Sequence, residues 1–80
     1  MEPEEERQHK PTARRIVEKA LEGESFTFHA RDYASRDFID IAAACAQGGG
    51  HLTITEAKRL ARPVRDEIEA AGGSHVTLQL

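Results

Sequence analysis

The chain has 80 residues, which makes one small domain near the size at which a single hydrophobic core is barely sufficient. Its formal net charge of −3 is unevenly spread, because residues 1–6 hold four of the fourteen acidic residues and no basic one. Residues 7–80 then carry eleven Lys and Arg against ten Asp and Glu, without the basic surplus typical of a nucleic-acid-binding module. No apolar run approaches the roughly 20 residues that a membrane-spanning helix needs.

The beginning of the chain is predicted to be a disordered acidic tail over residues 1–11. This segment is charged, has prolines at positions 3 and 11, and lacks both periodic apolar residues and the apolar segment of a secretion signal. Residues 12–80 are predicted to form one α/β domain. The single cysteine, Cys45, excludes an internal disulfide and indicates a reducing, cytoplasmic location.

In the folded part, the first helix is predicted over residues 12–22, with Thr12 as its N-cap and Gly23 as its left-handed stop. A short strand follows, in which Phe26 and Phe28 alternate with polar residues. The next helix begins at the capping residue Ser35 and ends near residue 47.

A second strand is predicted over residues 51–55, after the triple glycine of residues 48–50. Residues 56–60 then form a connector with one loose helical turn. The third helix begins with Pro63 at its first position and ends at Gly72. A third strand follows over residues 75–80, so the domain consists of three units, each a helix, a Gly-containing turn and a strand.

The spacing of the strands predicts a parallel sheet. Leu52 follows Phe26 by 26 positions and Val76 follows Leu52 by 24, which leaves room for a helical crossover rather than a hairpin. All three strands alternate in the same phase, so one sheet face is apolar and the other polar. Because a parallel sheet covered on both faces shows continuous apolar runs, we expect a two-layer αβαβαβ fold, strand order 1-2-3, with all helices on one face.

At this level the chain resembles the short α/β solenoid repeats of which leucine-rich repeats are the best known, through its period and through Leu52-x-Ile54 and Val76-x-Leu78. It departs from them at Arg31 and Ala57, where those repeats carry Asn or Cys. The resemblance implies a partner-binding surface on the open sheet face and no enzymatic activity. A nucleotide site of the Rossmann type is disfavoured, because the triple glycine precedes a strand instead of a helix.

The polar side of the predicted sheet is the candidate binding site. The seven candidate residues are hydroxyl or imidazole side chains at alternating strand positions: Thr27, His29, His51, Thr53, Thr55, His75 and Thr77. Such residues keep a solvent-facing sheet polar and favour β-structure. They also suit a docking surface for another protein or a second copy of the chain, which is the function we expect.

Other functions have less support in the sequence. His51 and His75 are adjacent in the alignment of the units, but two ligands are too few for a metal site, and we expect no metal or cofactor. No catalytic spacing is present, so we expect no enzyme. The alternative is a nucleic-acid-associated regulator that uses the arginines of the first and third helices. We disfavour it, because carboxylates are interleaved with these arginines. We expect no membrane partner, and a homo-oligomer through a sheet edge or the open face is consistent with the unprotected edges.

Overall fold

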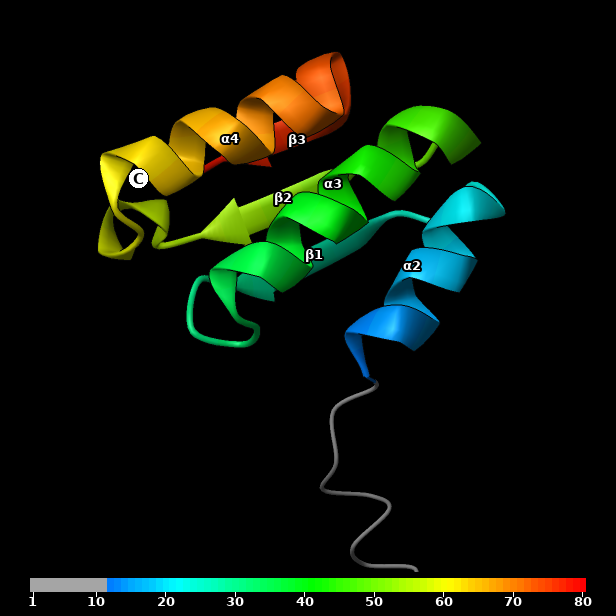
Figure 1. The fold of residues 1–80 in the computed structure, drawn as a ribbon, viewed down its shortest axis with the longest axis horizontal. Coiled ribbons are helices and arrows are strands. Elements are labelled where there is room, and N and C mark those ends of the chain that lie inside the picture. The colour runs from blue at the N-terminus through cyan, green and yellow to red at the C-terminus, as the bar shows by residue number, and fades with distance from the viewer. Residues whose placement is uncertain (1–11) are drawn as a thin grey trace, which may run out of the picture.

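The computed structural model describes residues 12–80, and the predicted acidic tail of residues 1–11 lies outside the described residues. The chain alternates helices and strands, as Figure 1 shows. The elements, in order, are α2 (Ala13–Leu21), β1 (Phe26–His29), α3 (Ser35–Gly48), β2 (Leu52–Thr55), the 3₁₀ turn η1 (Ala57–Arg59), α4 (Arg62–Gly72), the 3₁₀ turn η2 (Gly73–His75) and β3 (Val76–Leu78).

The three strands form one parallel sheet in the order β1-β2-β3, which confirms the predicted topology. The observed register pairs the same residues as the alignment of the three sequence units does. Phe26 is opposite Leu52, which is opposite Val76, and the middle threonines of the three strands form one row. The two faces of the sheet therefore carry the side chains assigned to them by the alternation.

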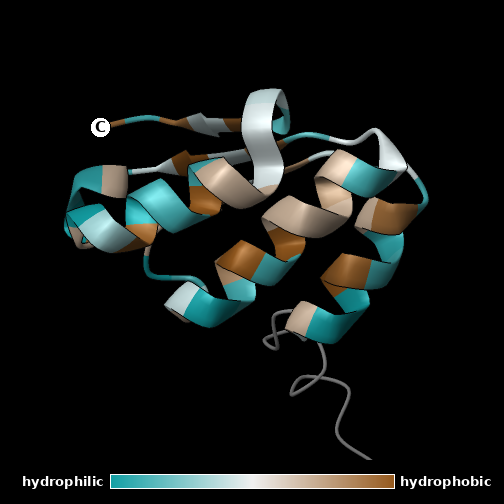
Figure 2. Cartoon of the chain, turned by 45° about the horizontal axis from the view of Figure 1, so that its top comes forward, coloured by the Kyte–Doolittle hydropathy of each residue, from teal (hydrophilic) through white to brown (hydrophobic). Residues whose placement is uncertain are grey.

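The apolar face of the sheet is covered by α2, α3 and α4, which lie on the same side of it (Figures 1 and 2). The side chains of Leu52 and Ile54 are fully buried under this layer, together with Phe38 and Ile41 of α3 and Ile68 of α4. In Figure 2, brown, hydrophobic segments occur on the helices and on the strands. The core is thus a single layer between the helices and the sheet.

The ends of the elements follow local chemistry, with small departures from the prediction. Thr12 caps α2 as predicted, and its hydroxyl accepts the N–H of Arg15 at 3.2 Å. The predicted cap Ser35 is instead the first residue of α3, after the extended Ala34. Pro63 is the second residue of α4 rather than the first, since Arg62 already has helical geometry there.

The end of α4 also differs from the prediction. Gly72 belongs to the helix, and Gly73, with a φ of 57°, ends it. The chain then makes the 3₁₀ turn η2, so β3 begins at Val76 and not at His75. Position 72 requires a glycine, because a Cβ there would lie 2.2 Å from Cγ2 of Val76.

The triple glycine serves two different purposes. Gly49 adopts a φ of 91° and caps α3 in the left-handed region, where a side chain is disfavoured. Gly48 and Gly50 allow close backbone contact instead: a Cβ on Gly48 would lie 2.1 Å from the carbonyl oxygen of Ala20, and one on Gly50 would lie 2.0 Å from that of Glu24. These contacts hold the end of α3 against the turn between α2 and β1.

Within residues 12–80, each helix is too short or too polar to cross a lipid bilayer.

Candidate functional site

The side of the sheet away from the helices carries the polar residues predicted from the sequence. We call the surface of Thr27, His29, His51, Thr53, Thr55 and Thr77 the open face. Thr27 and Thr77 are exposed, and the other four residues are partly exposed. Because strand side chains alternate between faces, and the intervening Leu52 and Ile54 are fully buried, the open face is opposite the helix layer.

Two strands are linked by a side-chain hydrogen bond on the open face. Nε2 of His51, just before β2, lies 2.8 Å from Oγ1 of Thr77 on β3. In the register Leu52 is opposite Val76, so this contact runs diagonally across the pair of strands. It orients the imidazole along the surface of the sheet and joins two of the predicted site residues.

His75 is held at a different place from His51. It lies in η2, ahead of β3, and its Nδ1–H donates a hydrogen bond of 2.8 Å to the carbonyl oxygen of Gly50. The two imidazoles therefore have separate partners, one at the glycine turn and one on β3. The structure brings His75 to the N-terminal end of the sheet, where its ring bonds to Gly50 and, within residues 12–80, not to another candidate residue.

His29 is the last residue of β1, and both of its backbone polar groups are hydrogen-bonded in the turn that follows. Its N–H donates to Oδ2 of Asp32 at 2.9 Å, and its carbonyl oxygen accepts the N–H of Asp32 at 2.9 Å. Nδ1 of the ring accepts the N–H of Arg31 at 3.0 Å. An acceptor Nδ1 places the proton of the neutral ring on Nε2.

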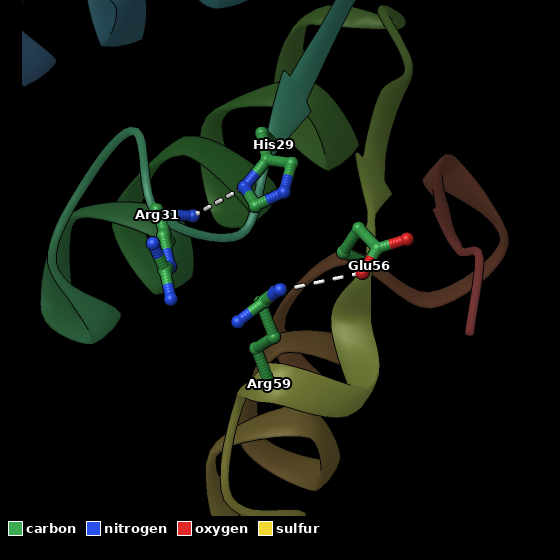
Figure 3. A network of polar contacts seen from close by, with 4 residues as sticks. All are labelled: His29, Arg31, Glu56 and Arg59. Carbon is green, nitrogen blue, oxygen red and sulfur yellow. Dashed lines mark hydrogen bonds and ion pairs between the residues drawn. The ribbon is translucent and has the colours of Figure 1, made fainter.

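Charged residues gather beside His29 at the carboxyl ends of β1 and β2 (Figure 3). Glu56 follows β2 with a φ of 56°, a left-handed conformation unusual for a residue other than glycine, and its Oε1 lies 3.5 Å from Nε of Arg59. The sequence pattern did not predict that Arg31, Glu56 and Arg59 lie beside His29. The rule that parallel strands present their carboxyl ends at one edge was the signal available for finding them.

The arginines named for the nucleic-acid alternative share their surfaces with carboxylates. A groove of about 590 Å³ between α2 and α3 is lined by Arg14 together with Glu18, Asp37 and Asp40. A second one, of about 360 Å³ between α4 and the end of the chain, combines Arg62 and Arg65 with Asp66 and Glu69. Neither groove has the uniformly positive lining that favours a phosphate backbone.

The open face offers hydroxyl and imidazole groups for hydrogen bonding. No cluster of three or more metal-ligating His, Cys, Asp or Glu side chains occurs within residues 12–80. Cys45 is buried in the core, away from the open face, and burial raises the pKa of its thiol. An unreactive, protonated thiol of this kind packs as a small hydrophobic side chain.

Comparisons with family models, with curated proteins and with solved structures found no match to this chain.

Proposed function

We propose that the chain is a small, non-enzymatic protein-interaction module that binds another protein on the open face. The observation that carries the proposal is the one-sided covering of the sheet: within residues 12–80, all the helices lie on the apolar side. The opposite side exposes hydroxyl and imidazole groups of Thr27, Thr53 and Thr77 and of the histidines beside them.

The geometry of the open face supports a protein partner. Short side chains on adjacent strands give a flat surface with few steric obstacles, and Thr and His both donate and accept hydrogen bonds. The His51–Thr77 contact holds an imidazole in place before binding, which lowers the ordering cost of an interface. The free thiol favours a cytoplasmic location for this module.

The experiment compares two lysine variants as bait. Thr53→Lys puts a long charged side chain at the centre of the open face, whereas Glu67→Lys puts the same side chain on the exposed surface of α4. A protein captured by the wild-type chain and by Glu67→Lys, but lost with Thr53→Lys, is then purified and titrated against all three chains.

We expect the purified partner to bind the wild type and Glu67→Lys equally and Thr53→Lys at least about tenfold more weakly, because an unpaired charge enters the interface. Equal binding by all three chains contradicts the proposal. Circular dichroism of the variants checks that each retains the fold.

A further inference from the structure

The two free edges of the sheet differ in whether their outward-pointing backbone N–H and C=O groups have hydrogen-bond partners. On β1, Phe26 and Ala30 donate to β2, so the N–H and C=O groups of Thr27 and His29 point outward. Asp32 takes both outward groups of His29, one with its side chain and one with its backbone. The edge of β1 is therefore closed at its carboxyl end, as natural proteins commonly protect an edge strand.

The edge of β3 has no such closure in the described part of the chain. Gln79 donates its N–H to Ile54 at 2.9 Å and accepts the N–H of Ala57 at 2.8 Å, so both of its groups point toward β2. Because backbone groups alternate along a strand, the N–H groups of Val76, Leu78 and Leu80 point away from the sheet. Figure 1 shows β3 as the outermost strand on this side.

Beside this edge, an apolar side chain is exposed to solvent and a buried donor has no hydrogen-bond partner within residues 12–80. Leu80 is 68% exposed, and it lines the groove of α4 together with the half-buried Leu78. In the same groove, Nε of Arg65 is buried and has no hydrogen-bond partner among residues 12–80. A buried donor without a partner carries a free-energy cost.

We propose that β3 pairs with β3 of a second copy of this chain, antiparallel about a twofold axis at Leu78. In this register Leu78 faces Leu78 of the second copy in a hydrogen-bonded pair, and Val76 faces Leu80 of the second copy. All of these residues lie on the helix side of the strand, so the pairing buries Leu80 against an apolar neighbour. The two sheets become one six-stranded sheet, and their open faces join into one surface.

The distribution of charge along the groove favours a second copy of this chain as the partner. Arg62 and Arg65 line it near the start of α4 and Asp66 and Glu69 further along, so its net charge is zero and its two signs are displaced along the helix. A twofold axis runs the two α4 helices antiparallel, which brings Arg65 of each copy near Glu69 of the other. The carboxylate of Glu69 is an acceptor for the outer N–H groups of the Arg65 guanidinium.

This inference rests on the proposed role as an interaction module and names one of its partners as the chain itself.

The first test is the molar mass by analytical ultracentrifugation across a range of concentrations. We expect a reversible rise from 8.9 kDa to twice that value. Leu80→Lys should raise the dissociation constant by at least about tenfold, since it places a charge against Val76 of the second copy. Leu21→Lys removes the other exposed large hydrophobic side chain of residues 12–80 and should leave the constant unchanged.

Charge reversal tests the helix contact. Arg65→Glu should weaken the dimer, because it sets two carboxylates of opposite copies against each other, and the double variant Arg65→Glu with Glu69→Arg should restore it. A role of Arg65 in folding alone would not be rescued by the second substitution. Failure of the double variant to regain dimer, when circular dichroism shows that it is folded, overturns the proposed contact.

Amide hydrogen exchange tests the register. The amides of Leu78 and Leu80 should gain protection as the concentration rises, while that of Gln79, already bonded to Ile54, should not change. A strict monomer at millimolar concentration overturns the inference, as does a monomer whose β3 edge instead accepts a strand of another protein. Both results leave the open-face proposal intact, because that proposal fails only if Thr53→Lys retains full partner binding.

Discussion

The imidazole of His51 and the hydroxyl of Thr77 are joined at 2.8 Å across the open face, between residues 26 positions apart in the chain. This hydrogen bond connects β2 to the outermost strand, β3, on the side of the sheet without helices. It therefore adds a link between these strands that is independent of the core packing and of the backbone ladder.

Replacing Thr77 by Val should remove this link without changing the shape or β-propensity of the side chain. We expect a loss of about 0.5 kcal/mol in the free energy of unfolding, at the low end for a hydrogen bond because the site is exposed. Urea denaturation followed by circular dichroism measures it. Thr27→Val, in the same row of the sheet, is the control, because its hydroxyl has no hydrogen-bond partner within residues 12–80; equal losses for the two variants would contradict the assigned role.

The triple glycine gives a second prediction, in which the three positions differ in cost. Gly48→Ala and Gly50→Ala each place a Cβ on a backbone carbonyl, and we expect each to destabilise the fold by about 2–3 kcal/mol through overpacking. Gly49→Ala meets no atom within 4 Å and should cost about 1 kcal/mol, for the left-handed backbone alone. Urea midpoints give the order, and Gly49→Ala as the most damaging of the three would refute it.

The sheet could be predicted from the sequence because it depends on periodicity. The alternation around Phe26, Leu52 and Val76 has the same phase in all three units, and the connecting segments are too long for hairpins. Those two facts determine both the parallel direction and the single layer of helices, and the structure has both. The threonine row of the open face follows from the same register.

The parts that could not be predicted depend on single backbone torsions and on turns. Nothing in the alternation indicates that Gly73 ends α4 and that a 3₁₀ turn places His75 ahead of the strand. Equally, the left-handed conformation of Glu56 and the fold of Asp32 back onto His29 are local arrangements without a periodic signal. The difference between the two sheet edges arises from such a turn.

Asp32 itself gives the third prediction, which concerns the edge of β1. Asp32→Ala removes the acceptor of the His29 N–H and should cost about 1 kcal/mol. It also leaves β1 open to another strand, so we expect larger assemblies by light scattering than the wild type forms. Asp32→Asn keeps an acceptor oxygen at the same position and should stay close to the wild type in both measurements. Matching behaviour of the Ala and Asn variants would show that the side-chain cap has no protective role.

Cys45 gives the fourth prediction, a loss of stability in alkaline solution. Burial raises the pKa of its thiol above the ordinary value of 9.0, so the folded state holds the proton more tightly than the unfolded state does. The resulting stability is complete below about pH 9 and is lost as the pH rises through the folded-state pKa, by at most about 1.4 kcal/mol per pH unit.

Urea unfolding of the wild type and of Cys45→Ala between pH 7 and pH 10 measures this effect. Tyr33 complicates the upper end of the range, because desolvation and the carboxylates of Asp32 and Asp37 raise its pKa from 10.0. Its contribution therefore begins to be lost near pH 10, at the upper end of this range, and Tyr33→Phe identifies it. We expect the Cys45→Ala curve to be flatter than the wild-type curve from about pH 9 upward, since the unfolded thiol ionises there while the buried one does not. Parallel curves would mean that the thiol gains water, and with it an ordinary pKa, in the folded state.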